Sequence, residues 1–341
     1  MSIEIFQSSN WFFNLWINGF EYQPKKYWLW CFAENENFNN CCLHLVQPAS
    51  GGGLISLSNY YSCLFGPEYN SNLYDNSNVL QRACFMRVLR GIPNSEFIKI
   101  QPLDPEEKWL IDIRKYFHRN CFYTLKFFCF GNWYHNTSGK EFMHYWADRP
   151  SPLRNSVARG KRRLSASGDW RIDVHTPHSH DLLGSLKDAI SAYEKVYENS
   201  WKSSEPCVNF IPGLVSMAAQ QGWLRLGILW FNEQPAAAQL WLVADGKANI
   251  YKLAYVQGLE RFSVGSVLTA ALMEYVIDID KVKEIDYLSG DDAYKVDWMT
   301  QRRERIGIMI FDLKKFKGWC QFGNYFSVKI INRMKKLIGL K

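Results

Sequence analysis

A glycine at the expected start of a helix is the first feature of this sequence that could support chemistry. Residues Tyr251–Val256 are typical of a strand, and a short loop connects them to Gly265-Ser266-Val267-Leu268, where a helix is expected to begin. Free N–H groups at a helix start bind phosphate oxygens, helped by the helix dipole. Gly265 would let the backbone approach a bulky anion. The segment therefore indicates an anion site, although a plain strand–loop–helix connection has the same pattern.

A second group of reactive side chains follows the next expected strand, Glu284–Leu288. Asp291, Asp292, Tyr294 and Lys295 come just after this strand, close enough in sequence to reach one edge of a cleft. Carboxylate, phenol and ammonium groups together can accept a proton, donate a proton and stabilise negative charge. The alternative is a solvated turn, because Asp beside Gly favours turns.

Other motifs are weaker. The spacing of His175, His178 and His180 could hold zinc, but no cysteine lies near and the segment is typical of a loop. The glycine run at residues 51–53 has no following Lys-Ser/Thr, and no Gly-x-Ser-x-Gly elbow occurs. We expect neither a metal site nor a serine triad.

The elements that would position these side chains form an ordered series in the second half of the chain. Apolar residues at helical spacing indicate the helices, and apolar strands are separated by turn residues at Asn232-Glu233 and Asp245-Gly246. The expected order is helix Asp181–Trp201, helix Ile211–Gln221, strands Trp223–Trp230, Ala236–Val243 and Asn249–Val256, helix Val264–Ile277, and strand Glu284–Leu288.

The first half alternates short strands and helices. We expect strands at Tyr27–Phe32, Cys41–Val46, Leu54–Leu57 and Cys121–Phe130, with helices at Val79–Leu89 and Pro105–Phe117. A Pro-rich junction near residue 150 precedes a basic helix that carries Arg154, Arg159, Lys161, Arg162 and Arg163, and then a strand, Ile172–His175. The predicted domains are an N-terminal lobe at 1–148, a basic inter-lobe segment at 149–180 and a catalytic lobe at 181–341.

Composition limits the class of protein. A chain of 341 residues fits two domains, and its net charge of +7 suits an anionic ligand without amounting to a nucleic-acid signature. Nine cysteines without CxxC spacing, and no signal peptide, favour buried reduced thiols in a cytoplasm. No apolar run is long enough to span a membrane. The basic amphipathic run Phe326–Ile338 could pack on the protein or contact an anionic membrane surface.

These motifs together resemble a known family. The stretch from about Asp181 to Phe311 is similar to the GNAT-type acyltransferase domain of the CelD/BcsL-like group, which resembles the two-lobed Fem peptidyltransferases. The resemblance rests on Tyr251–Tyr255, on the Ser263–Leu268 turn, and on Gly290-Asp291, Ala293-Tyr294-Lys295 and Trp298. Ser151-Pro152-Leu153-Arg154-Asn155 also resembles the group's inter-lobe segment. The first 145 residues resemble the degenerate N-terminal lobe only loosely.

The resemblance implies a mixed α/β fold with two GNAT-like lobes in tandem, and an acceptor held in a cleft between them. It implies an acyltransferase that moves an acyl group from acyl-CoA or acyl carrier protein to an amine on a small molecule or peptide. The alternatives are a Fem-like ligase that uses aminoacyl-tRNA and a GNAT-fold binding protein without catalysis. No nucleic acid other than such a tRNA, and no metal, is expected as a partner.

The resemblance also assigns residues to roles. The donor's pantetheine arm would lie along the strand Asn249–Val256 and its phosphates at the following loop and helix start. The donor-binding residues are then Leu253, Tyr255, Val256, Gly258, Arg261, Gly265 and Ser266, with Trp241 and Tyr251 assigned to substrate. The loop has fewer glycines than the usual GNAT phosphate loop, which is why a carrier protein remains an alternative to coenzyme A.

The chemistry implied is acylation of an amine. Asp291 and Asp292 are the candidate bases for the amine, Tyr294 is the candidate acid for the leaving thiolate, and Lys295 would stabilise the oxyanion or a carboxylate on the acceptor, as the corresponding lysine does in Fem-like enzymes.

Overall fold

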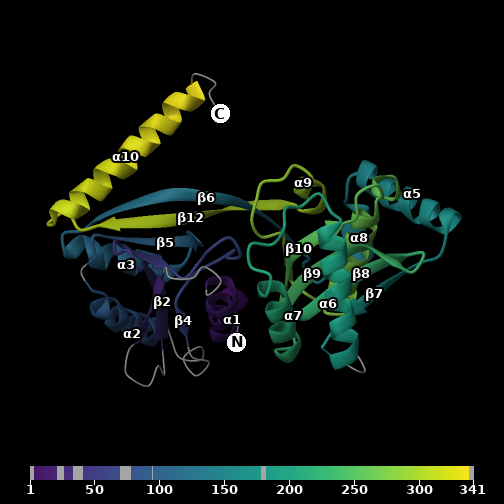
Figure 1. The fold of residues 1–341 in the computed structure, drawn as a ribbon, viewed down its shortest axis with the longest axis horizontal. Coiled ribbons are helices and arrows are strands. Elements are labelled where there is room, and N and C mark those ends of the chain that lie inside the picture. The colour runs from purple at the N-terminus through teal and green to yellow at the C-terminus, as the bar shows by residue number, and fades with distance from the viewer. Residues whose placement is uncertain are drawn as a thin grey trace. The chain divides into compact units, whose positions relative to one another are not determined.

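Two compact units make up the chain, and each combines stretches that are distant in sequence. The computed structural model describes residues 4–20, 27–33, 41–69, 78–93, 95–177 and 182–337 (Figure 1). Unit 1 comprises Phe6–Cys129 and Glu304–Lys341, and unit 2 comprises Phe130–Arg303 with a few residues near the N-terminus, including Glu4 and Ile5. The edges of the units therefore lie at 129/130 and 303/304, rather than at the expected residues 148 and 180.

Two strands contribute to both units. Strand β6 (Tyr123–Asn136) begins in unit 1 and ends in unit 2, while β12 (Gln301–Phe311) runs from unit 2 into unit 1. The expected strand Cys121–Phe130 corresponds to the first part of β6, which continues six residues further than expected. The longer strand is the reason that unit 2 begins before the predicted junction near residue 150.

Unit 1 is a mixed sheet with helices. Its strand order is β1-β2-β3-β5-β12-β6, with β4 paired to β2. Strands β1 and β2 are antiparallel, whereas β3 and β5 are parallel. The elements are α1 (Ser9–Asn14), β1 (Tyr27–Ala33), β2 (Cys41–Pro48), β3 (Leu54–Ser56), β4 (Glu68–Tyr69), α2 (Asn78–Gly91), β5 (Phe97–Leu103), α3 (Lys108–Arg119) and α10 (Phe316–Leu337).

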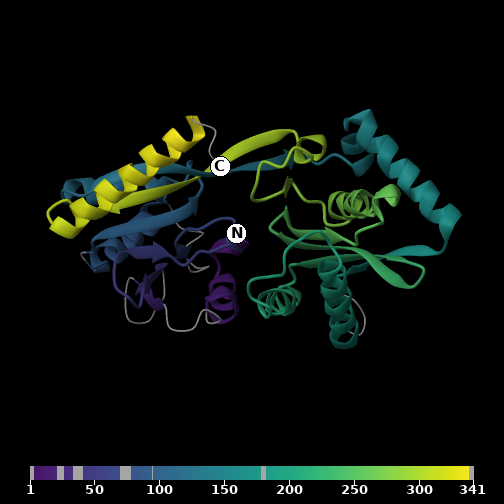
Figure 2. The same ribbon diagram turned by 45° about the horizontal axis from the view of Figure 1, so that its top comes forward.

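The strands of unit 2 follow the order β6-β11-β10-β9-β8-β7 and are mixed parallel and antiparallel. Helix α8 covers one face, and α6 and α7 cover the other (Figure 2). The elements are α4 (Phe142–Ala147), α5 (Ser151–Ser167), β7 (Trp170–His175), α6 (Leu182–Glu198), α7 (Phe210–Gln220), β8 (Leu224–Phe231), β9 (Gln234–Ala244), β10 (Lys247–Tyr255), α8 (Val264–Asp278), β11 (Glu284–Asp286) and α9 (Lys295–Trp298). The expected order of helices and strands is confirmed.

The turns between β8, β9 and β10 are two residues long, as the sequence indicated. Asn232 and Glu233 have φ of 49° and 59°, and Asp245 and Gly246 have φ of 48° and 73°. Positive φ at both central residues is the geometry that matches the twist of two hairpin strands. Asn, Asp and Gly tolerate this region best, so local chemistry fixes the register of three adjacent strands.

Strand β12 was missed by sequence reasoning because its first residues are strongly basic. Arg302, Arg303 and Arg305 interrupt the apolar alternation that marks a strand. Each arginine finds an acid in the fold: Arg302 pairs with Asp291 at 2.7 Å, Arg303 with the fully buried Asp286, and Arg305 with Asp104. Pairing that depends on distant residues leaves no signal in a local window.

None of the nine cysteines, all of which are described, forms a disulfide. Cys31, Cys121 and Cys320 are exposed, so the expectation of burial holds only in part. Among the described residues, no helix combines the length and apolar character needed to cross a bilayer. Phe316 and Trp319 are exposed at the start of α10, and its contact with a membrane surface stays a prediction. His178 and His180 lie outside the described residues.

Candidate functional site

Strands β10 and β11 of unit 2 pair only at their first residues. Lys247–Asn249 pair in parallel with Glu284–Asp286, where β11 ends, while β10 continues to Tyr255. On its other side β10 pairs with β9 throughout, with a register shift between Ile250 and Lys252. The printed pairing of β10 with β11 therefore stops at Asn249, and residues 250–255 extend past the end of β11. A strand that extends past its neighbour can offer backbone groups to an extended ligand.

The C-terminal end of β10 leads through a short loop to the first turn of α8. The first α-helical bond of α8 runs from the N–H of Val267 to the carbonyl of Ser263, 2.9 Å away, so the N–H groups of Val264, Gly265 and Ser266 precede the ladder. A cavity of about 170 Å³ is lined by these three residues together with Tyr255, Glu260 and Ser263. Such N–H groups and the positive end of the helix dipole favour an anion in this cavity.

Most of the predicted donor residues are at or near this cavity. Tyr255, Gly265 and Ser266 line it directly. Gly258 and Arg261 are exposed on the loop before α8. Leu253 and Val256 are half-buried on β10 and just after it. The structure thus brings the predicted set to one end of β10, while their contact with a donor stays a prediction.

Helix α5 packs against residues 261–263, in the loop before α8, and holds this loop in place. Gly160 lies so close to the loop that an added Cβ would come within 2.5 Å of the carbonyl oxygen of Phe262. The hydroxyl groups of Ser156 and Ser263 are 3.1 Å apart, and the guanidinium of Arg163 donates to the carbonyl of Arg261 at 2.8 Å. The basic segment expected between the lobes therefore supports the loop of unit 2.

A buried polar network anchors the first turn of α8 to the sheet. The side-chain amide of Gln239 donates to the carbonyl of Gly265 at 3.1 Å and to the hydroxyl of Thr269 at 2.7 Å. It also accepts from the indole N–H of Trp241 at 2.9 Å. Trp241 is fully buried, so the structure places this predicted substrate residue in the core, whereas Tyr251 is half-buried at the register shift in β10.

Lys295 is buried, and carbonyl groups surround its ammonium. The Nζ atom donates to the carbonyls of Ser289 at 2.6 Å, Gly290 at 3.2 Å and Tyr287 at 3.4 Å. Asp292 adds a carboxylate oxygen 3.2 Å from the same atom. An ammonium group has three protons, and here these contacts use all of them. In this arrangement Lys295 fixes the turn after β11, and its role as an oxyanion group stays a prediction.

Asp291 and Tyr294 differ in their surroundings. Asp291 is exposed and accepts a bidentate pair of hydrogen bonds from Arg302: Nε to Oδ1 at 2.8 Å and Nη2 to Oδ2 at 2.7 Å. These hydrogen bonds lower the pKa of the Asp291 carboxyl group. A lowered pKa makes it a weaker base than an unpaired aspartate. Tyr294 packs edge-on against the buried Tyr287, with ring centroids 5.7 Å apart. Burial raises the pKa of Tyr294, so its hydroxyl keeps its proton at neutral pH.

A group of charged and aromatic residues around β10 was not predicted from the sequence. Lys252 on β10 is buried and forms an ion pair of 2.8 Å with Glu205. Lys202 lies over the rings of Tyr197 and Trp201, 5.9 Å from each centroid. We call these five residues the lysine–aromatic cluster. They come from α6, the following loop and β10, so no single sequence window contains them.

Electrostatics connects this cluster to the turn after β11. Burial and then repulsion from Lys252 lower the pKa of Lys202 to about 8, while Asp292 and Lys295 also act on it. Trp201 packs on Tyr255, with ring centroids 4.3 Å apart, and Tyr255 lines the cavity at α8. The anion cavity, the lysine–aromatic cluster and the turn at residues 291–295 are therefore neighbouring parts of one site.

A second cavity in unit 1 is larger, about 700 Å³, and contains none of the predicted site residues. Its lining carries charges of both signs: Asp104, Glu106, Glu107 and Asp112, together with Arg82, Lys108 and Lys115. The smaller cavity at α8 is the better candidate for donor phosphates, because it lies at the start of a helix.

Comparison with known proteins identifies the domain that contains the site. Residues 151–296 match the family model described as an acetyltransferase (GNAT) domain, which includes β10, α8 and the turn after β11. Residues 151–296 therefore have the GNAT fold, and the whole chain is built of two units. No curated protein matches the chain. The GNAT prediction is thus confirmed, and the assignment to the CelD/BcsL-like group stays a prediction.

Three solved structures share this fold over most of their length. FemX is 10% identical, with a TM-score of 0.55, and the match covers 92% of this chain and 93% of that one. The C-terminal domain of a putative lysylphosphatidylglycerol synthetase from Agrobacterium fabrum is 12% identical, with a TM-score of 0.53 and 85% of both chains covered. L-PGS from Bacillus licheniformis is 10% identical, with a TM-score of 0.50 and coverage of 84% and 85%. These similarities establish a Fem-related two-lobed fold.

Proposed function

We propose that this chain is an N-acyltransferase that moves an acyl group from a pantetheine thioester to an amine. The observation that carries the proposal is the cavity at the first turn of α8, which lies next to the end of β10, where that strand extends past β11. A pantetheine arm is extended and has amide groups that can pair with a strand edge. The phosphate at its end suits the helix start.

The reaction needs a base, a polarised carbonyl and an acid. The neutral amine attacks the thioester carbonyl, and the C–S bond then breaks. Lys202, whose pKa of about 8 leaves part of it neutral near physiological pH, accepts the proton from the amine. Tyr294, whose hydroxyl is protonated at neutral pH, gives its proton to the departing thiolate and regains a proton from solvent. In this proposal Lys202 replaces Asp291 as the base, because Arg302 occupies the carboxylate of Asp291.

A carrier protein is the donor that the loop fits better. The wall of the α8 cavity includes the carboxylate of Glu260, and the loop has few glycines. A carrier-bound arm brings one phosphate group to this cavity, whereas coenzyme A brings several. Helix α5, which holds the loop, exposes Arg154, Arg159, Lys161 and Arg162. These side chains would attract the acidic surface of a carrier protein.

An aminoacyl-tRNA donor is the second candidate. It is favoured by the whole-chain fold similarity to FemX and to the lysylphosphatidylglycerol synthetase domain. A tRNA donor also presents an activated acyl group, as an ester, and the same base and acid would serve the transfer. The exposed arginines of α5 would then contact the tRNA backbone instead of a carrier.

The test offers the full-length chain three donors with isotopically labelled acyl groups: an acyl-CoA, an acyl carrier protein and an aminoacyl-tRNA. A panel of primary amines serves as acceptor, and mass spectrometry detects labelled amides. Product from either thioester supports the proposal, and the ratio of rates identifies the better donor. Product from the tRNA alone supports the second candidate, and no product from any donor supports a binding protein without catalysis.

A variant of Tyr294 tests the proposed acid. Tyr294→Phe keeps the ring that packs on Tyr287 and removes only the hydroxyl. We expect kcat to fall by about 10²-fold, in the range typical of general acid catalysis, with donor affinity unchanged. Tyr60→Phe, at an exposed tyrosine of unit 1, is the matched control. Wild-type kcat in Tyr294→Phe would show that another group protonates the thiolate.

A further inference from the structure

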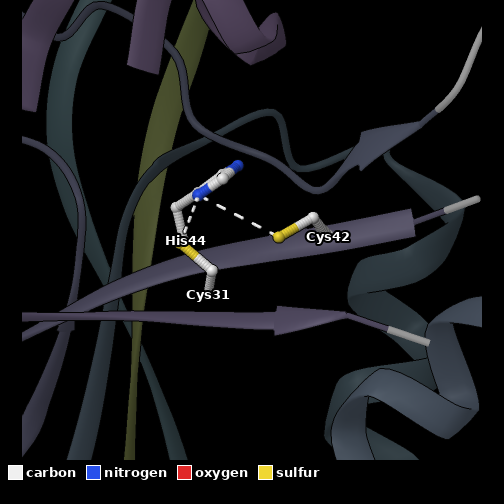
Figure 3. Close-up of side chains that lie close together, drawn as sticks. All are labelled: Cys31, Cys42 and His44. Atoms are coloured by element: carbon white, nitrogen blue, oxygen red, sulfur yellow. Dashed lines mark hydrogen bonds between the residues drawn. The ribbon is translucent and has the colours of Figure 1, made fainter. Parts of the chain in front are cut away.

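Two cysteines and a histidine meet on one face of the β1–β2 hairpin in unit 1. Cys31 on β1 is directly opposite His44 on β2 in the antiparallel register. Cys42 precedes His44 by two residues, so it faces the same side of the strand. Figure 3 shows the three side chains converging. One ligand atom from each lies within 4.8 Å of the other two.

The spacing of these atoms suits a tetrahedral metal ion. The Sγ of Cys31 is 3.4 Å and the Sγ of Cys42 is 4.0 Å from Nδ1 of His44. A tetrahedral zinc ion with usual bond lengths separates a thiolate sulfur and an imidazole nitrogen by about 3.6 Å. The two observed distances lie on either side of this value. Small side-chain rotations would therefore place all three atoms around one ion.

The histidine is oriented by a second layer of contacts, as metal-binding histidines are. Its other ring nitrogen, Nε2, is 2.7 Å from a carboxylate oxygen of Glu68 on β4. The hydroxyl of Ser9 at the start of α1 donates to the other oxygen of Glu68, and the ring of Phe12 packs on the imidazole with centroids 4.4 Å apart. A carboxylate on the far nitrogen holds Nδ1 toward an ion and increases its basicity.

We propose that Cys31, Cys42 and His44 bind a divalent ion of the zinc class, with water as the fourth ligand. Two thiolates and an imidazole are the donor set that zinc prefers. Cys42 is buried and the side chain of His44 is only 12% exposed, whereas Cys31 is exposed. The open side at Cys31 provides the entry path and the fourth position. The site belongs to unit 1 and lies outside the GNAT domain at residues 151–296.

This site has neither CxxC spacing nor clustered histidines, which is why no metal was expected from the sequence. Cys31 is separated from Cys42 and His44 by residues 32–41, and only the strand register brings it opposite His44. The Cys-x-His spacing of Cys42 and His44 matches the period of a strand, so this signal becomes visible once β2 is recognised.

Metal analysis of the full-length chain tests the site. Protein purified without chelators is expected to contain about one zinc ion per chain by mass spectrometry. After removal of the metal and addition of Co²⁺, we expect a thiolate-to-cobalt charge-transfer band and the visible bands of tetrahedral cobalt. A wild-type chain that binds neither ion stoichiometrically, or cobalt without the thiolate band, would overturn the proposal.

Variants assign the ligands. Cys42→Ser and His44→Gln should each weaken zinc binding by at least about 100-fold, and Glu68→Gln by about 10–100-fold. Cys41→Ser is the matched control, because Cys41 is the adjacent buried cysteine of β2 and points to the opposite face. Zinc affinity is measured by competition with a chromogenic chelator. Equal losses in Cys41→Ser and Cys42→Ser would contradict the assignment.

Alkylation gives a test that requires no variant. Cys31, Cys121 and Cys320 are all exposed thiols. Zinc should slow the reaction of Cys31 with iodoacetamide at least tenfold and leave Cys121 and Cys320 unchanged, as followed by peptide mass spectrometry. Equal rates at Cys31 with and without zinc would show that Cys31 is not a ligand.

Discussion

The start of α8 gives the sharpest prediction, through a pair of substitutions that differ only in charge. An added Cβ at Gly265 would lie 3.1 Å from Cδ1 of Tyr255, so the tyrosine ring must shift by a few tenths of an ångström. Gly265→Asn and Gly265→Asp impose the same crowding. Only the aspartate adds a negative charge to the wall of the cavity that we assign to the donor phosphate.

The size of the effect follows from electrostatics. At about 5 Å and an effective dielectric constant between about 20 and 80, a carboxylate and one phosphate charge repel by about 1–3 kcal/mol. Since about 1.4 kcal/mol corresponds to a tenfold change in Kd, Gly265→Asp should bind the donor at least about tenfold more weakly than Gly265→Asn. The ratio should shrink as salt rises, because screening weakens the repulsion at this surface.

Calorimetric titration of each variant with the donor measures the ratio, and thermal unfolding checks the fold. An aspartate in the first turn of a helix interacts favourably with the helix dipole, so Gly265→Asp should be as stable as Gly265→Asn without ligand. Equal Kd values for the two variants, with both folded, would refute the placement of the donor phosphate at α8.

Three further predictions concern the turn at residues 291–295, Lys202 and the unit boundary. If Lys295 stabilises the oxyanion, Lys295→Met should lower kcat by about 100-fold. The same change should cost about 1–3 kcal/mol of unfolding free energy, because the carbonyls of Ser289 and Gly290 lose their donor. Wild-type kcat together with wild-type Tm would rule out both the oxyanion role and the structural role. If the neutral amine of Lys202 is the base, kcat/KM should rise as pH increases through about 8, and Lys202→Met should abolish this limb of the pH profile. A fragment that begins at Ser151 lacks residues 134–136 of β6, which pair with β11, and should therefore be insoluble; a soluble, active fragment would show that unit 2 does not need this strand.

Local patterns predicted much of unit 2. The two-residue turns at Asn232-Glu233 and Asp245-Gly246 have the positive φ that their residue types favour, so the three central strands could be placed from sequence. The helix beginning near Gly265 was likewise visible, because an apolar helical period follows a strand and a loop. In both cases, the information lies within a short window of sequence.

The rest depends on contacts between distant residues. The charged start of β12 is compatible with a strand only because Asp286 and Asp104 neutralise Arg303 and Arg305 in the fold. Burial, and then repulsion from Lys252 on β10, lower the pKa of Lys202, and neither effect can be read from the sequence around Lys202. The resemblance assigned Trp241 to substrate, whereas the structure encloses its indole in the core, where the N–H donates to Gln239.

The most direct test of the donor site is amide hydrogen exchange of the full-length chain, with and without the donor that gives product. The account predicts slower exchange at residues 250–255, where β10 extends past the end of β11, and at residues 264–266 in the first turn of α8. Helix α3 in unit 1 should exchange equally in both states. Protection that appears elsewhere while these two segments remain unchanged would contradict the account.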